Sequence, residues 1–108
     1  MYYAWDEIEV RTGMAQAFVE FMGVGYVGPA EARGLKLEGV WITPPVEPAG
    51  EASRVLVLWS FADAAAFWRQ RHGARDDATV GEWWKEAERF VLKRERSYLT
   101  PASISPLQ

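Results

Sequence analysis

The sequence predicts an α+β domain in which strands and helices follow the order β-α-β-β-α-α-β. Four segments have the apolar alternation or the continuous apolar character that is typical of strands, at 1–10, 35–43, 54–60 and 91–99. The segments between them carry apolar stripes at helical spacing, and glycine, proline and capping patterns divide one element from the next.

The first strand, 1–10, alternates at period two. The face that we expect to point toward the helices carries Ala4, Asp6, Ile8 and Val10. The helix that follows has Thr12 as its predicted N-cap. We expect it to be interrupted near 25–29 and to resume to Arg33, because glycine weakens helices and Pro29 fits only the first turn of a new one.

The second and third strands flank a Pro/Gly loop that suits the turn of a hairpin. The continuous apolar run of 54–60 favours a central strand that is covered on both faces. Ser60 and Asp63 match the capping-box pattern, so we expect a helix over 61–73 that stops at Gly73.

A loop is expected at 74–79, and Thr79 with Glu82 forms a second capping-box pattern that opens the next helix. The last strand, 91–99, is charged, which suits the edge of a sheet. In a ferredoxin-like arrangement this strand lies beside the first one, so Asp6 can pair with Arg94 or Arg96.

The predicted fold is therefore ferredoxin-like, with a four-stranded antiparallel sheet and helices on one face. Trp5, Val40 and Ile42 are expected on the other face. A chain of 108 residues has no second layer to cover that face, and a two-fold partner is the simplest cover. We place the domain at 1–100 and an extended C-terminal tail at 101–108.

Composition excludes several function classes. The net charge is -3 and no basic stripe exists, so nucleic acid and membrane surfaces are not expected partners. The chain has no cysteine and one histidine, which removes disulfides, thiolate nucleophiles and sulfur-ligated metals; we expect no cofactor and no metal. Neither a signal peptide nor a long apolar run is visible, so a cytoplasmic location is the expectation.

Three segments resemble a known family. The opening "MYYAWDEIEVRTG", the central "LVLWSFADAAAFWRQR" and the ending "YLTPASISPL" look like the corresponding segments of NIPSNAP-like domains. The resemblance implies the dimeric α/β barrel superfamily, in which two ferredoxin-like protomers join their sheets into one barrel. Similar proteins often carry arginine where this chain has Asp6, which reverses the charge at that position.

The superfamily includes cofactor-independent monooxygenases, polyketide cyclases, lactone isomerases and haem-handling enzymes. Many of its members bind a small aromatic or lipophilic molecule between the sheet and the helices. In similar cyclases a histidine near the end of the central helix acts as acid or base, and an aromatic residue of the first helix lines the cavity. The resemblance thus points to His72 and Tyr26.

The candidate catalytic residues are His72, Asp6 and Tyr26, and each has a structural alternative. His72 is the one imidazole of the chain, a group suited to acid–base catalysis, but it can equally be a solvated histidine at a helix end. Asp6 is either a tuned carboxylate base or half of a structural ion pair. Tyr26 either lines a pocket mouth or packs on the surface.

The candidate substrate-binding residues are aromatic side chains that could stack on a flat ligand, together with one arginine: Trp59, Trp68, Phe18, Phe21, Phe67, Trp84 and Arg96. Most such aromatics in a small domain are simply core.

Two functions follow as hypotheses. The first is a small-molecule enzyme that acts on a flat, apolar, oxygenated substrate, polyketide-like or aromatic, by cofactor-independent proton transfer or by oxygenation. The second is a non-catalytic dimeric protein that binds a small molecule or serves as an accessory protein.

Overall fold

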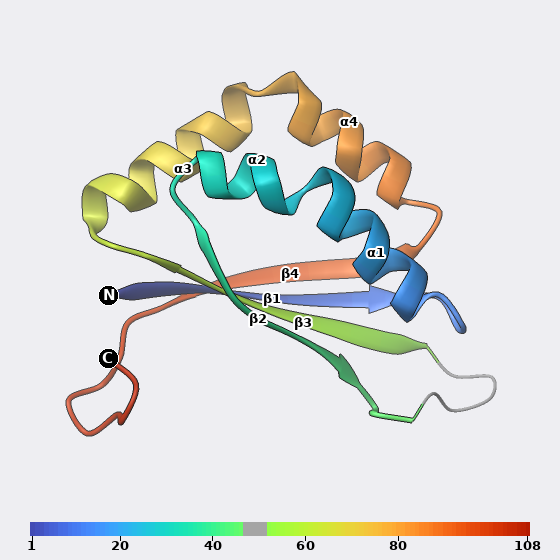
Figure 1. Ribbon diagram of the computed structural model, residues 1–108, viewed down its shortest axis with the longest axis horizontal. Coiled ribbons are helices and arrows are strands. Elements are labelled where there is room, and N and C mark those ends of the chain that lie inside the picture. Colours follow the sequence, from blue (N-terminus) through green and yellow to red (C-terminus); the bar gives the residue numbers. More distant parts are fainter. Residues whose placement is uncertain (47–51) are drawn as a thin grey trace.

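The computed structural model describes residues 1–46 and 52–108, which form one antiparallel sheet of four strands with helices over one face (Figure 1). The strands run in the spatial order β2-β3-β1-β4. Their bounds are Tyr2–Val10 for β1, Lys36–Thr43 for β2, Ser53–Phe61 for β3 and Val91–Leu99 for β4. The ferredoxin-like order predicted from the sequence is confirmed, with β3 and β1 in the centre and β4 at an edge.

Four helices lie above the sheet: α1 at Ala15–Gly25, α2 at Val27–Ala32, α3 at Ala64–Asp76 and α4 at Ala78–Ala87. The predicted interruption of the first helical segment is present, because Tyr26 separates α1 from α2. The predicted N-cap at Thr12 is wrong. Helix α1 begins one turn later, and its N-cap residue Met14 makes no side-chain capping bond.

The capping boxes predicted for α3 and α4 are also wrong. Asp63 is itself the N-cap of α3, and its carboxylate accepts a hydrogen bond of 2.8 Å from the Ala66 amide. Ser60 belongs to β3 and donates to Glu38 at 2.7 Å. An aspartate at the N-cap accepts hydrogen bonds from the first free amides of the helix by itself, so the second residue of a capping box is not required.

The central helix does not stop at Gly73, and the segment predicted as a loop at 74–79 is mostly helical. Only Asp77 leaves the helical conformation between α3 and α4, and it caps α4 by accepting from the Thr79 amide at 2.9 Å. Glycine in a helix interior costs only about 1 kcal/mol, which tertiary contacts can offset.

Strand β2 departs from simple alternation. Its register with β3 shifts between Leu37 and Gly39, so that Val40 pairs with Val57 and Ile42 with Val55 on the helix-facing side. The placement of Val40 and Ile42 on the open face was therefore wrong. A bulge inserts one residue and inverts the faces beyond it.

The core lies between the sheet and the helices. The side chains of Val55, Val57 and Trp59 on β3 are fully buried, as predicted for a central strand. On β4 the register sets Arg94 opposite Ile8 and Arg96 opposite Asp6, so both arginines share the helix-facing side of the sheet. This is the orientation that the alternation predicted.

Part of the face away from the helices is apolar and only partly covered. Trp5 and Trp41 lie there with their ring centroids 6.1 Å apart, and Trp41 is half exposed. The C-terminal segment turns back beneath one end of the sheet (Figure 1). There the Tyr3 hydroxyl donates to the Gln108 backbone carbonyl at 3.0 Å, which buries Tyr3.

Candidate functional site

A cleft of about 1160 Å³ opens between helix α4 and the edge strand β4. Its floor is formed by β1 and β4, and its roof by α4 and the end of α3, with Tyr26 at the α1–α2 break as a further wall. Apolar lining comes from Ile8, Val80, Trp84 and Val91. Of the candidate residues predicted from the sequence, the cleft brings together Asp6, Tyr26, Trp84 and Arg96.

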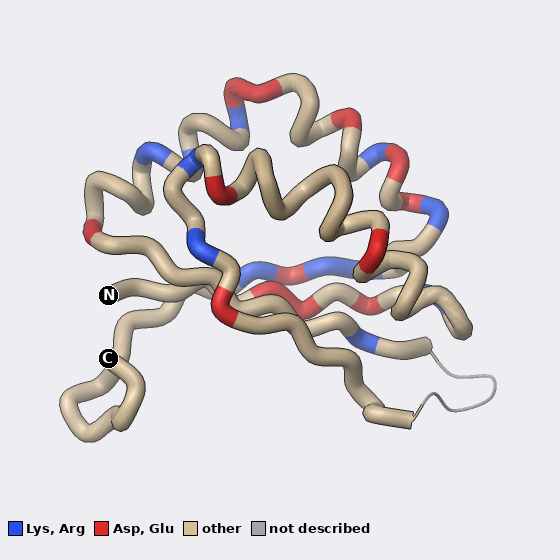
Figure 2. The backbone as a smooth tube through the Cα atoms, viewed as in Figure 1, with Lys and Arg blue, Asp and Glu red and all other residues tan. Residues whose placement is uncertain are grey.

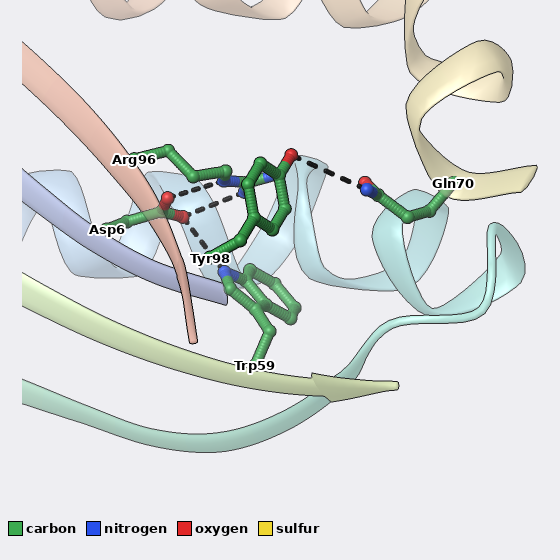
Figure 3. A network of polar contacts seen from close by, with 5 residues as sticks. All are labelled: Asp6, Trp59, Gln70, Arg96 and Tyr98. Carbon is green, nitrogen blue, oxygen red and sulfur yellow. Dashed lines mark hydrogen bonds and ion pairs between the residues drawn. The ribbon is translucent and has the colours of Figure 1, made fainter. Parts of the chain in front are cut away.

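Asp6 and Arg96 form a paired charge at the floor of this cleft (Figure 3). The Arg96 Nε donates to Asp6 Oδ1 at 2.6 Å, and an Nη donates to Oδ2 at 2.9 Å. The Trp59 indole N–H, from β3, donates to the same Oδ2 at 2.9 Å. Three donors thus converge on one buried carboxylate, a geometry that binds the charged form strongly.

This pairing raises the pKa of Arg96. Burial alone would lower it, but the hydrogen bonds and the negative charge of Asp6 outweigh that effect, with smaller support from Tyr26 and Tyr98. A carboxylate offers about four acceptor positions, and three of them are in use at Asp6. The geometry is that of a structural ion pair across neighbouring strands.

The network extends from Arg96 to helix α3. Tyr98 follows Arg96 on the same face of β4, and its phenol oxygen contributes to the raised pKa of Arg96. The Tyr98 hydroxyl in turn accepts a long bond of 3.5 Å from the buried Gln70 amide (Figure 3). Side chains of β1, β3, β4 and α3 are therefore tied together beside the cleft.

Arg94 differs from Arg96 although it lies on the same face. Its guanidinium sits 3.7 Å from the centre of the Trp84 ring, and no ion pair in the described part of the chain includes it. Burial against the neighbouring side chains lowers the pKa of Arg94, the Tyr26 phenol opposes this effect, and the group remains a cation at physiological pH. Figure 2 shows the charged positions of β4 running beside those of β1.

Tyr26 is buried at the break between α1 and α2. Its ring packs against Trp83 at 4.8 Å and Trp84 at 5.4 Å between centroids. Its phenol interacts electrostatically with both Arg94 and Arg96, so it belongs to the charged end of the cleft. No hydrogen bond of its hydroxyl occurs within residues 1–46 and 52–108.

His72 lies elsewhere. It is exposed on α3, where its ring stacks loosely on the exposed Trp68 with centroids 5.8 Å apart. Neither side chain is among those that line the cleft. The spacing of four residues puts the two on one helix face, as the sequence indicated, but that face is turned to solvent.

The remaining candidates are packing residues. Phe18 is fully buried, and Phe21 stacks on Trp83 with centroids 5.0 Å apart. Phe67 contacts Phe61 and Tyr98 at the start of α3. Trp59 is buried, and it meets the site through its bond to Asp6 and an edge contact with the Tyr26 ring at 6.1 Å between centroids.

Sequence reasoning missed Arg94 as a binding candidate. It identified Arg94 as inward-facing and as one of two partners for Asp6, and the strand register decided between the two. No three His, Asp or Glu side chains within the described residues gather as metal ligands. No helix in the described part of the chain is long and apolar enough to cross a membrane.

Comparison with known proteins identifies the family. The NIPSNAP family model matches residues 8–106. The chain belongs to the NIPSNAP family. No curated protein matches it.

Solved structures of NIPSNAP proteins share the fold. A NIPSNAP domain protein from Burkholderia xenovorans superposes with a TM-score of 0.76 at 18% identity, covering 98% of this chain and 99% of that one. A NIPSNAP family protein from Agrobacterium tumefaciens gives 0.76 at 16% identity, covering 100% of this chain and 94% of that one.

The same fold extends beyond NIPSNAP proteins. A protein from Nitrosomonas europaea, proposed to be an antibiotic biosynthesis monooxygenase, gives a TM-score of 0.61 at 13% identity, covering 94% of this chain and 98% of that one. These identities are low, so the likeness concerns the fold of the NIPSNAP domain and not its chemistry.

Proposed function

We propose that this NIPSNAP-family chain binds a flat, oxygenated small molecule in the cleft between α4 and β4. The observation that carries the proposal is the combination of an apolar wall with two polar groups that make no hydrogen bond or ion pair in the described part of the chain. Trp84, Ile8 and Val80 supply the wall, while the Tyr26 phenol and the Arg94 guanidinium supply donors at one end. Ligand pockets commonly combine a mostly apolar lining with a few polar groups that orient the ligand.

The catalytic form of the proposal is cofactor-independent proton transfer, as in cyclisation or isomerisation, with oxygenation as the variant. In this form Tyr26 donates a hydrogen bond to a substrate oxygen, and Arg94 stabilises the negative charge that develops on it. Asp6 acts by positioning Arg96, because its oxygens are already engaged by three donors. His72 has no part in this arrangement, since it is exposed and outside the cleft lining.

A neutral fluorescent probe of suitable shape, N-phenylnaphthylamine, tests the site. Gly81 lines the cleft on α4, and a Cβ added there meets open space, so we choose Gly81→Trp as the variant designed to block the cleft. Gly23→Trp is the matched control, because Gly23 is an exposed glycine of α1 that lines no part of the cleft.

We expect saturable binding by the wild type and by Gly23→Trp, and loss of binding in Gly81→Trp. Absence of wild-type binding both for this probe and for its anionic analogue anilinonaphthalene sulfonate, or binding that is unchanged in Gly81→Trp, would refute the proposed site. A Tyr26→Phe variant that keeps full turnover of an identified substrate would refute the catalytic form alone.

The open face of the sheet favours a second candidate function, that of a dimeric binding or accessory protein. Trp5, Trp41, Leu56 and Leu58 leave a partly exposed apolar surface on the side away from the helices. We propose that a second copy covers it in the cytoplasm. Light scattering should give twice the 12.2 kDa chain mass, and Trp41→Lys should give a monomer; a monomeric wild type would contradict the dimer.

A further inference from the structure

We infer that the ligand of the cleft carries a negative charge on an aromatic or similarly flat body, and that Arg94 is the residue that selects for this charge. This inference rests on the proposed function, since it assumes that the cleft binds a small molecule. It adds the chemical class of the ligand and the group that distinguishes it from a neutral analogue.

The two inward-facing arginines of β4 are not equivalent. Arg96 is neutralised by Asp6 through two short hydrogen bonds, so the pair adds little net charge to the floor. Arg94 lies opposite Ile8, which has no charge to offer. The strand register therefore leaves one cation at the cleft without a carboxylate partner in the described part of the chain.

The other charged residues of the lining do not replace that partner. Lys93 and Glu95 alternate with Arg94 and Arg96 along β4, so their side chains leave from the face of the sheet away from the helices, opposite Glu9 and Glu7 in the strand register. Asp77 is engaged in capping α4, and Arg75 contacts Asp76 at 3.3 Å. Lys85 and Glu88 are exposed on α4 and carry opposite charges.

Trp84 holds the Arg94 guanidinium for recognition. A guanidinium that lies 3.7 Å over an indole ring is fixed in a plane and keeps its N–H edge available. Such an edge binds carboxylate or sulfonate oxygens through parallel hydrogen bonds. The Tyr26 phenol on the same side of the cleft supplies a further donor.

A matched pair of probes tests the charge. Anilinonaphthalene sulfonate and N-phenylnaphthylamine share one aromatic framework, but only the first carries an anion. Arg94→Gln removes the charge. The control is Arg89→Gln, because Arg89 also stacks on aromatic rings, at 4.8 Å from Phe21 and 4.7 Å from Phe90, yet does not line the cleft.

We expect Arg94→Gln to weaken binding of the sulfonate by about tenfold or more while the neutral probe changes by less than about twofold. Arg89→Gln should change neither. In the wild type, added salt should weaken sulfonate binding and leave the neutral probe unaffected, which tests the inference even if a variant folds poorly.

Two outcomes would overturn the inference and leave the proposed function standing. One is that both probes bind in the cleft, as judged by loss in Gly81→Trp, and that Arg94→Gln affects them equally or not at all. The other is that only the neutral probe binds there. If neither probe binds in the cleft, the proposed function and the inference fail together.

Discussion

The substitution Asp6→Asn tests how the two arginines of β4 are divided in role. It keeps the size of the side chain and removes its charge. Arg96, whose side chain is 24% exposed, would then hold a cation without a counter-charge, beside an amide that can no longer accept from all three donors. The Trp59 indole N–H would compete with Arg96 for one remaining carbonyl oxygen.

The expected destabilisation follows from this geometry. Breaking a buried ion pair by removing one partner costs about 3–5 kcal/mol. The exposed fraction of Arg96 lets water reach the guanidinium, so we expect the lower end, about 3 kcal/mol. A domain of this size has a free energy of unfolding of about 5–15 kcal/mol, so the loss is large but leaves the chain folded.

Urea unfolding followed by tryptophan fluorescence measures this difference at neutral pH. The control is Glu7→Gln, at the next residue of the same strand. Glu7 forms an exposed ion pair with Arg54 at 3.8 Å, and the substitution removes it. Exposed pairs contribute about 0–1 kcal/mol, so the control should hardly move the midpoint. Equal effects of the two substitutions would refute the view that Asp6 compensates a buried charge.

A double substitution separates the contribution of charge compensation to stability from that of the side-chain contacts of the pair. In Asp6→Leu with Arg96→Met, no charge is left uncompensated, and only the Trp59 N–H loses a partner, at about 1–3 kcal/mol. The double variant should therefore be no less stable than Asp6→Asn. A markedly less stable double variant would mean that the pair contributes through its contacts and not through charge compensation.

Three further predictions concern the helices. Gly25→Ala should destabilise the protein by about 1–3 kcal/mol, because the added Cβ would lie 2.8 Å from the buried Trp83 Nε1. Gly23 has open space around it, so Gly23→Ala should stabilise the protein by about 0.5–1 kcal/mol in the same urea assay. Asp63→Ala should cost about 1 kcal/mol through loss of the α3 cap, and a loss as small as that of a surface residue would contradict the capping role. Hydrogen bonds from Thr79 lower the pKa of Asp77 below its ordinary value of 3.8. The ionised carboxylate therefore stabilises the protein above that pH, and this stabilisation is lost as the pH falls through the folded-state pKa. Asp77→Asn should make the melting temperature fall less steeply below about pH 4, and an unchanged slope would contradict this.

Much of the fold was predictable because its signals are local. The strand at 91–99 and the break after Gly25 follow from residue types alone, and both lie where expected. Alternation along β1 and β4 sets Asp6, Arg94 and Arg96 on one face provided that no bulge intervenes, and the register is regular at these positions, with its shift between Glu9 and Val10. These predictions hold because a strand without a bulge repeats its faces every two residues.

The errors arise where tertiary contacts override a local signal. The prediction for Val40 and Ile42 is wrong because a bulge near Gly39 inverts the alternation. A glycine inside a strand often marks a bulge, so Gly39 was the signal in the sequence that could have revealed it. The predicted helix stop at Gly73 is wrong, because α3 continues over this glycine to Asp76 and the side chain of Arg33 lies close to the helix at this point.

The site illustrates the same limit more sharply. The sequence predicts His72 as a catalytic residue because imidazole is a common acid or base. It does not predict Arg94 as a binding residue, because the role of Arg94 depends on which residue of β1 lies opposite it. Two arginines separated by one residue are equivalent in a sequence. The register pairs one of them with Asp6 and the other with Ile8, and this difference alone makes the first a structural group and the second an available cation. The functional identity of the site is thus a property of strand register, which residue types one by one do not reveal.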